Sequence, residues 1–371
     1  MYPLRRKQQI PVDIFNFITS IFFHTTKASM PVDWTKVQNI AVVNTIDVIG
    51  DNIILVPFFK ILKQNAPQAK ITYFTKSLVK EVLGAQGIID EFVPVDYKDG
   101  FSTNISKVKA LKNKKFDVAI APSGDVRDIF LMHYLHATRK MSHTRTGGSQ
   151  FLTDAYLPDY TNIYAHIVDD KLYVLKKAGC QYTKDERYPK LILNAAEQQA
   201  NEHFIKEHGL ENKKILGIHP GASGGAREWP YYGELLAAIL KQEPNLAIII
   251  FCDKTCWDTA QRINEQIGKK AIIFNGTISN YLRLVSVCHN FISNDSGAAH
   301  IAAAYGLKTI DIFTNNIPEW WGALNYKQPT TCISHKLPCK PCRCLKKCPK
   351  GTNECRDSIT VEEVLEAYKK L

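Results

Sequence analysis

The chain has 371 residues and a formal net charge of +11, from 47 lysine and arginine residues against 36 aspartate and glutamate residues. This excess favours an anionic partner, either a phosphorylated substrate or an anionic membrane surface. A nucleic-acid partner is not expected, because no run of basic residues is interleaved with aromatic residues. A transmembrane helix is not expected either, because no apolar run reaches the ~18–20 residues that cross a bilayer. The length suits two domains of ordinary size.

Residues 1–37 form an extension ahead of the first predicted strand. A basic triplet at 5–7 precedes a run at 10–23 that is mostly apolar, in the manner of a signal peptide, and 14–23 is its most apolar segment. Asp13 and Asn16 interrupt the apolar residues and no clean cleavage site follows, so we expect the segment to be retained. Two interpretations stay open: the segment lies on a membrane surface beside the basic triplet, or it forms a helix packed on the protein itself.

Strand-like and helix-like runs alternate through residues 38–190, the first predicted domain. Strands are expected at 37–44, 70–74, 91–95 and 116–121, and helices at 52–65, 77–85, 106–112, 126–137 and 163–179. The alternation predicts a parallel sheet covered on both faces. Ligands of such sheets bind beyond the carboxyl ends of the strands, where Gly50 and Asp51 fall.

The alternation restarts in the second predicted domain, residues 191–330. Strands are expected at 214–219, 246–251, 271–274, 289–293 and 309–313, and helices at 195–208, 229–240, 254–267, 279–287 and 297–305. The fold class is therefore α/β, with two Rossmann-like parallel-sheet domains facing a central cleft. The remaining residues, 331–371, form a cysteine-rich segment and a C-terminal helix that starts after Thr360.

Two stretches of the second domain have the composition of an anion site. Gly221, Ala222 and Ser223 follow one strand, with Arg227 shortly after them. Asp295, Ser296 and Gly297 follow another strand and open a helix, whose first N–H groups can hold an anion. The alternative is that Asp295 or Ser296 is only a helix cap. Small residues, hydroxyls and a guanidinium on one wall suit a diphosphate, and a carboxylate on the opposite wall suits activation of a hydroxyl.

Three ordered motifs carry a family resemblance. They are Ile-Gly-Asp at 49–51 before a helix that contains Pro57, His-Pro-Gly-Ala-Ser at 219–223 with Arg-Glu-Trp-Pro at 227–230, and Asn-Asp-Ser-Gly at 294–297 with His300. In this order and spacing they resemble the ADP-heptose:lipopolysaccharide heptosyltransferases of glycosyltransferase family 9. The resemblance implies a GT-B fold that binds the acceptor mainly in the first domain and the nucleotide-sugar in the second. It also implies an inverting transfer that requires no metal or other cofactor for catalysis.

The resemblance also assigns roles to individual residues. Asp51 matches the catalytic aspartate and would take the proton from the acceptor hydroxyl, although it could instead only cap its helix. Arg227 stands where the family usually has lysine and would offset charge on the departing diphosphate, unless it is a solvated loop arginine. Ser223 and the backbone N–H groups beside it would hold phosphate oxygens. Asp295 would accept hydrogen bonds from sugar hydroxyls or backbone N–H groups. His300 either contacts the nucleotide-sugar or is a core histidine.

Six of the ten cysteines lie in the last 40 residues, at positions 332, 339, 342, 344, 348 and 355. A structural zinc site at Cys339, Cys342, Cys348 and Cys355 is one hypothesis, because closely spaced thiolates form tetrahedral zinc sites. Disulfide bonds, which need an oxidising compartment, and reduced free thiols are the alternatives.

We therefore predict a cytoplasmic glycosyltransferase, peripheral on the inner membrane, which transfers heptose from ADP-heptose to a lipopolysaccharide or lipooligosaccharide core acceptor. The acceptor would lie at the inner face of the membrane, where the basic balance suits its phosphates and carboxylates. Alternatives are a glycosyltransferase with another nucleotide-sugar donor, a noncatalytic nucleotide-sugar-binding protein, and an epimerase on paired Rossmann-like domains.

Overall fold

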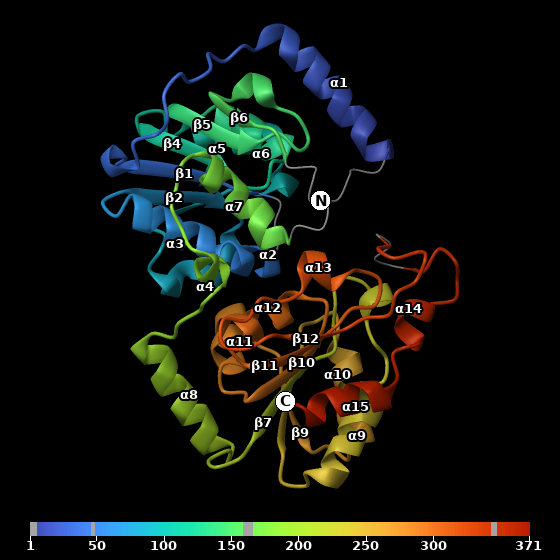
Figure 1. Cartoon of the computed structure of the whole chain (residues 1–371). Helices are drawn as coiled ribbons and strands as arrows, with labels where there is room; N and C mark the ends of the chain where they lie inside the picture. The colour runs from blue at the N-terminus through green and yellow to red at the C-terminus, as the bar shows by residue number, and fades with distance from the viewer. Residues whose placement is uncertain (1–5, 46–48, 159–165, 343–346) are drawn as a thin grey trace. The chain divides into compact units, whose positions relative to one another are not determined.

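The computed structural model describes residues 6–45, 49–158, 166–342 and 347–371. The chain divides into two compact units, Met1–Arg187 and Tyr188–Leu371. Each unit has its own parallel sheet with helices on both faces (Figure 1). The predicted α/β class with two Rossmann-like sheets is confirmed.

The first unit is built on a six-stranded sheet with the order β3-β2-β1-β4-β5-β6, in which every neighbouring pair is parallel. The central strand β1 is almost entirely apolar, and its last four residues are buried, as a strand covered on both faces requires. The strands are β1 (Asn39–Val43), β2 (Lys70–Thr75), β3 (Glu91–Pro94), β4 (Phe116–Ala121), β5 (Ala137–His143) and β6 (Asp154–Tyr156).

The helices of this unit differ from the sequence prediction in one place that concerns the candidate site. The helix predicted over 52–65 is two helices, which separate at Leu55. Pro57 lies in the first turn of the second helix, where its missing N–H is tolerated, whereas inside a continuous helix it would break a hydrogen bond. The helices are α1 (Arg6–Phe22), α2 (Ile49–Ile54), α3 (Val56–Asn65), α4 (Ser77–Leu83), α5 (Phe101–Lys109), α6 (Val126–His133) and α7 (Ile167–Lys177), with 3₁₀ turns η1 (Trp34–Lys36), η2 (Gly84–Gln86), η3 (Tyr97–Asp99), η4 (Ser149–Phe151) and η5 (Lys184–Arg187).

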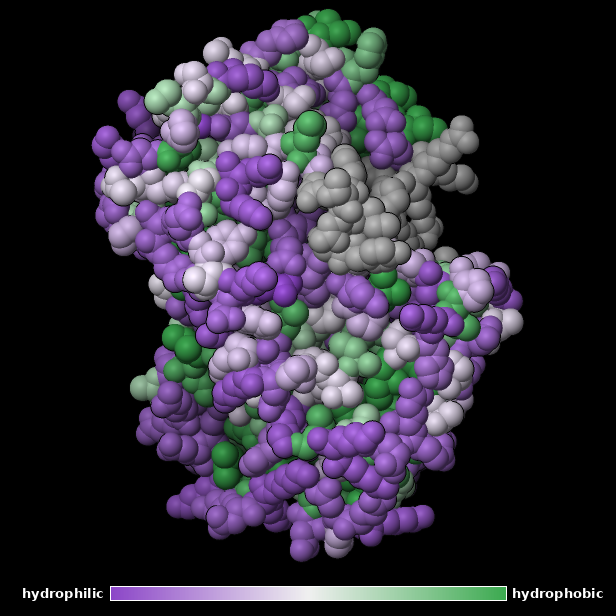
Figure 2. Space-filling view, in the orientation of Figure 1, coloured by the Kyte–Doolittle hydropathy of each residue, from purple (hydrophilic) through white to green (hydrophobic). Residues whose placement is uncertain are grey.

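Helix α1 packs on the first unit through one of its faces. The Asn16 side chain donates to Thr146 O at 2.8 Å and accepts from Gly148 N at 2.9 Å, while Phe15 meets the Phe130 ring edge-on. Gly147, between these two partners, has φ +94°, and a Cβ there would lie 2.1 Å from Asn16. Hydrophobic side chains on another face of α1 remain at the surface (Figure 2). Within the described residues, every helix is too short or too polar to cross a membrane.

The second unit repeats the layout, with the strand order β12-β11-β10-β7-β8-β9 and parallel pairing throughout. Its strands are β7 (Ile215–His219), β8 (Ala247–Phe251), β9 (Ala271–Phe274), β10 (Asn290–Asn294), β11 (Lys308–Ile312) and β12 (Thr331–Ile333). Its helices are α8 (Ala195–Glu207), α9 (Tyr232–Gln242), α10 (Trp257–Gln266), α11 (Ile278–Val285), α12 (Gly297–Ala304), α13 (Pro318–Trp321), α14 (Glu354–Asp357) and α15 (Val361–Lys369), with the 3₁₀ turn η6 (Gly225–Arg227).

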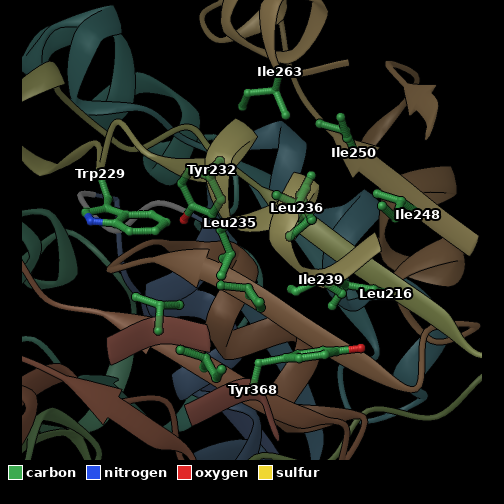
Figure 3. Packing of buried hydrophobic residues seen from close by; sticks show 14 of the residues in the cluster. Leu216, Trp229, Tyr232, Leu235, Leu236, Ile239, Ile248, Ile250, Ile263 and Tyr368 are labelled. Carbon is green, nitrogen blue, oxygen red and sulfur yellow. The ribbon is translucent and has the colours of Figure 1, made fainter. Parts of the chain in front are cut away.

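The C-terminal segment is part of the second unit. Strand β12 extends the sheet beside β11, and Tyr368 of α15 lies in the same buried cluster as Leu235 and Ile239 of α9 (Figure 3). Trp229, which is 1% exposed, donates from its indole N–H to Ile359 O at 2.8 Å and ties the segment ahead of α9 to the chain just before α15. Strand β12 and helix α15 thus complete the sheet and the core of this unit.

A buried carboxylate connects two loops of the first unit. Asp128 in α6 has no exposed surface, and its carboxylate accepts hydrogen bonds from Thr45 N (3.0 Å), Thr45 Oγ1 (2.6 Å) and Ser123 Oγ (2.8 Å). Burial, with a smaller contribution from Asp125, raises the pKa of Asp128 to about 7. Asp128 therefore joins the end of β1 to the loop that follows β4.

This raised pKa gives a pH dependence with a definite sign. Between its ordinary value of 3.8 and about 7, folded Asp128 keeps a proton that the unfolded chain has released. The free energy of unfolding therefore falls as pH rises through this window, by up to roughly 1.4 kcal/mol per pH unit from this group. Asp128→Asn removes that contribution. We expect the difference in free energy of unfolding between wild type and variant, measured by urea denaturation at several pH values from 4.5 to 8, to decrease as pH rises.

The same substitution at exposed Asp185 is the control. A stability difference between wild type and Asp128→Asn that stays constant over this range would contradict the assignment.

Candidate functional site

Each sheet has a switch point, where the order in which strands are added to the sheet reverses from one side to the other. In the first sheet this point lies between β1 and β4, and in the second it lies between β7 and β10. The loops beyond the carboxyl ends of such strand pairs diverge and leave a crevice, the usual ligand position in open parallel sheets. We call the groups that follow β1 and β4 the first-unit site, and those that follow β7 and β10 the second-unit site (Figure 1).

Asp51 lies in the first-unit site, as the third residue of α2. Because α2 begins at Ile49, Asp51 is inside the first turn and does not occupy the capping position that the sequence left open. Its side chain is half-exposed, whereas Gly50 before it is buried.

A buried hydrogen-bond chain fixes α2 beneath Asp51. Asn44, just after β1, donates to Tyr73 Oη at 2.9 Å, and Tyr73 donates to Asn52 Oδ1 at 2.7 Å. All three side chains are buried, where the loss of a hydrogen bond is costly. The sequence prediction missed Asn44 and Asn52. The available signal was two amide residues inside otherwise apolar runs, which demand buried partners.

Two arginines follow β4 and β5 at the same edge of the first sheet. Arg127 binds Asp125 through Nε and Nη2, both at 2.8 Å, and its guanidinium lies 4.5 Å from the centre of the Tyr97 ring. Arg145 Nη1 lies 3.6 Å from Asp170 Oδ2, a longer pairing. Neither arginine belonged to a sequence motif. Each arginine is thus paired with an aspartate, Arg127 more closely than Arg145.

The side chain of Asn294 holds loop 220–228, which leads into the second-unit site. This residue ends β10 and is fully buried. Its side-chain amide donates to Pro220 O at 2.6 Å, and its side-chain oxygen accepts from Trp229 N at 3.0 Å. One carboxamide thus bridges the two ends of loop 220–228. Thr314 adds a bond from its hydroxyl to Ala226 O at 3.1 Å.

Loop 220–228 brings Ser223 and Arg227 next to Asp295. Arg227 lies in η6, not in an irregular loop as predicted, and its Nη1 donates to Ser223 Oγ at 3.3 Å and lies 3.6 Å from Asp295 Oδ2. Within the described chain, Arg227 Nε is buried and has no hydrogen-bond partner. Gly221 packs so closely that a Cβ would lie 2.8 Å from Cys256 Sγ, whereas Ala222 is half-buried.

Asp295 is 6% exposed and accepts a hydrogen bond from the Asn316 side chain at 3.0 Å. Burial raises the pKa of this carboxyl, and the nearby Arg227 guanidinium opposes the rise. Asp295 is therefore oriented by an amide on one side and a cation on the other. Asn316 was not predicted from the sequence.

The structure gives Ser296 a capping role and His300 a buried position. Ser296 is the N-cap of α12 and accepts from Ala298 N at 3.3 Å. Capping does not exclude a ligand, because Gly297, which opens the helix, is half-exposed at the same helix end. His300 is 7% exposed, which favours a core histidine over direct ligand contact.

Lys340 brings a further charge to the second-unit site. Its Nζ donates to Ser334 Oγ at 2.7 Å and to Phe313 O at 3.1 Å, and its charge acts on Asp295. Cys342 N donates to Asn315 O at 2.7 Å, so the cysteine-rich segment lies against the loop that follows β11. No sequence pattern singled out Lys340, because its position depends on how this segment folds back.

The four cysteines proposed as zinc ligands differ in exposure: Cys339 is exposed, and Cys342, Cys348 and Cys355 are half-buried. Among the residues the structure describes, no three His, Cys, Asp or Glu side chains are grouped so that they could hold a metal ion. The backbone N–H groups of residues 350–353 lower the pKa of the Cys348 thiol. Cys344 lies outside the described residues. Zinc at these cysteines stays a prediction.

The bridge made by Asn294 predicts a loss of stability on substitution. Asn294→Ala would leave Trp229 N–H and Pro220 C=O buried without their partner, and an unsatisfied buried group costs about 1–3 kcal/mol. We expect the free energy of unfolding, from urea denaturation, to fall by roughly this amount. Asn113→Ala, at an exposed position, is the matched control. Equal stability of the two variants would show that Asn294 does not hold the loop.

Comparison with known proteins places the chain in a family. Over 173 residues it is 34% identical to lipooligosaccharide heptosyltransferase 2 of Campylobacter jejuni subsp. jejuni, a match that covers 43% of this chain and 52% of that protein. The chain thus spans about half the length of this relative. Its fold is similar to that of the family 9 glycosyl transferase from Veillonella parvula, with a TM-score of 0.78 and 20% identity over 92% of this chain and 98% of that one.

A second solved structure agrees on the fold. It is E. coli ADP-heptose lps heptosyltransferase II, with a TM-score of 0.72 and 16% identity over 90% of this chain and 98% of that one. The model of glycosyltransferase family 9 (heptosyltransferase) matches residues 105–351, well over half of the sequence. The chain therefore belongs to glycosyltransferase family 9, the heptosyltransferase family.

Proposed function

We propose that the protein is an inverting glycosyltransferase that moves heptose from ADP-heptose to a lipopolysaccharide or lipooligosaccharide core acceptor. The observation that carries the proposal is the grouping of Ser223, Arg227 and Asp295 beside the N-terminus of α12, at the switch point of the second sheet. The names of the similar proteins, lipooligosaccharide heptosyltransferase 2 and ADP-heptose lps heptosyltransferase II, support the choice of sugar and acceptor.

In this proposal the second-unit site binds the donor. The diphosphate would accept hydrogen bonds from Ser223 and from backbone N–H groups at Gly221, Ala222 and Gly297. Arg227 Nε, buried and unpartnered within the described chain, would donate to a phosphate oxygen. Asp295, which cannot approach the diphosphate without repulsion, would accept from sugar hydroxyls on the side away from Arg227.

Asp51 would be the general base. Its carboxylate would take the proton from the acceptor hydroxyl while that oxygen bonds to the anomeric carbon from the face opposite the leaving group. The bond from the anomeric carbon to the diphosphate oxygen breaks in the same step, and ADP leaves with the bonding electron pair. Arg227 would stabilise the charge that builds on the departing phosphate. The proton on Asp51 then passes to solvent, and no cofactor takes part.

The first-unit site would hold the acceptor. Core acceptors carry phosphates and carboxylates, and Arg145, paired with Asp170 only at 3.6 Å, is the cation there with the looser internal pairing. Such an acceptor belongs to the inner face of the bacterial inner membrane, so the protein would work on the cytoplasmic side.

Arg227 also favours a second candidate, a transfer from another nucleotide-sugar. Arginine presents a planar fork where the family usually has lysine, so the geometry at the diphosphate would differ. A noncatalytic nucleotide-sugar-binding protein is the remaining alternative. Calorimetry with ADP, UDP, GDP and CDP in the presence of EDTA distinguishes between the possible donors. Selective ADP binding supports the heptosyltransferase, another preference changes the donor, and no binding at all contradicts a nucleotide site.

Asp51→Asn tests the base. The amide keeps the size of the carboxylate but cannot accept the proton, so we expect turnover of ADP-heptose to fall by about a hundred- to ten-thousandfold. ADP affinity, measured by calorimetry, should stay within about twofold, because Asp51 belongs to the other unit. Unchanged turnover would refute the assignment of Asp51. Asp185→Asn, at an exposed position of the same unit, controls for the loss of one negative charge.

Arg227→Ala tests the cation. Its loss should lower ADP affinity by about tenfold and turnover by a further hundredfold or so, because charge on the diphosphate grows as the sugar leaves. Arg227→Lys keeps the charge and restores the usual family residue, so we expect it to keep turnover within about tenfold of wild type. If both variants lose activity equally, the fork geometry matters more than the charge. If neither loses activity, Arg227 does not touch the donor.

A further inference from the structure

Helix α1 presents a hydrophobic stripe to solvent. Residues at spacings of three and four along the helix share one face, and here they are large and apolar. Phe17 is 70% exposed and Phe22 is 73% exposed. The stripe consists of Ile10, Ile14, Phe17, Ile18, Ile21 and Phe22, and hydrophobic residues gather along this helix in Figure 2.

The stripe faces outward because the other side of α1 is firmly attached. Asn16 makes two hydrogen bonds with the backbone at Thr146 and Gly148, and Thr19 Oγ1 accepts from Gln150 Nε2 at 2.6 Å. Phe15 packs against Phe130. These contacts prevent the helix from turning its apolar face inward. An amphipathic surface helix normally buries its apolar stripe. An exposed stripe of this kind therefore indicates a surface that binds a partner.

The charges around the stripe indicate what that occupant is. In the sequence, the basic triplet at 5–7 comes ahead of the stripe, and Asp13 is the sole acidic residue of the helix sequence. The Asp13 carboxylate accepts from Gln9 at 2.7 Å. An apolar stripe with a basic end matches an anionic lipid surface, where acyl chains take up the side chains and headgroups pair with the cations.

Length fixes the orientation. A helix of 17 residues is about 25 Å long, which is shorter than the ~30 Å hydrocarbon core of a bilayer. It also contains Asp13 and Asn16, which a spanning segment would have to bury in lipid. The helix therefore suits the plane of the interface and not a crossing.

We propose that α1 is a membrane-binding element, which lies in the plane of an anionic phospholipid surface with its stripe in the acyl region. The assignment depends on the helix alone and goes beyond the proposed sugar transfer. It would bring the first-unit site to a membrane-borne acceptor, since the helix is fixed to that unit by Asn16 and Thr19.

The test is flotation of the full-length protein with phosphatidylcholine vesicles that contain either no anionic lipid or about 30% phosphatidylglycerol. We expect wild type to float with the anionic vesicles and at least tenfold more weakly with the neutral ones. Phe17→Ser combined with Phe22→Ser should weaken binding to anionic vesicles by at least tenfold. The matched control combines Leu78→Ser with Ile192→Ser, two exposed apolar positions outside α1 that should leave binding unchanged.

Three results would overturn the proposal. Wild type does not float, or the Phe17 and Phe22 variant floats as well as wild type, or that variant converts a dimer to a monomer while neither protein binds vesicles. In the third case the stripe is an interface between two copies. Circular dichroism and the turnover of a short soluble acceptor, both expected to be unchanged in the variant, show that it is folded. Vesicle binding without any turnover in wild type would contradict the proposed function and leave this inference intact.

Discussion

The buried carboxamide of Asn294 is the interaction on which the second-unit site depends. It satisfies Pro220 C=O and Trp229 N–H, the two ends of a loop whose backbone has left the sheet and can no longer be paired by neighbouring strands. Because Asn294 is also the last residue of β10, the loop is fixed relative to the very next residue, Asp295. The short distances among Ser223, Arg227 and Asp295 follow from that single anchor.

The first unit solves the same problem with different side chains. Where β1 ends, Asp128 accepts a hydrogen bond from Thr45. The side chain of Tyr73 links Asn44 to Asn52 through two further hydrogen bonds. In both units, buried polar groups stand at the point where strands diverge, since this is where the backbone stops pairing and a ligand needs rigid walls. The raised pKa of Asp128 is the energetic consequence of putting a carboxyl there.

The apolar face of α1 is exposed because the opposite face is the one attached to the first unit. Its contacts with the first unit use one amide, one hydroxyl and aromatic edges, and they leave six large apolar side chains exposed to solvent. The two interpretations of residues 14–23, packing on the protein and lying on a membrane, are compatible because a helix has two sides. The face of α1 that packs on the protein keeps the opposite, apolar face exposed, where it can contact lipid.

The sequence by itself determined the α/β class, the order of most elements and the positions where ligand-binding groups would fall. This was possible because buried parallel strands are continuous apolar runs and because site residues follow them directly. It missed β5, β6 and β12, whose residues are polar enough to resemble loops, and it joined α2 to α3 across Leu55. Edge strands and short helices owe their conformation to neighbours that are distant in sequence. The same holds for Asn294, Asn316 and Lys340, whose roles depend on contacts across the sheet edge that no local pattern encodes. Only the tertiary structure decided which side of α1 is buried. The hydrophobic periodicity of the helix alone predicts that its apolar face is buried. The polar contacts of Asn16 and Thr19 instead attach the opposite face to the protein.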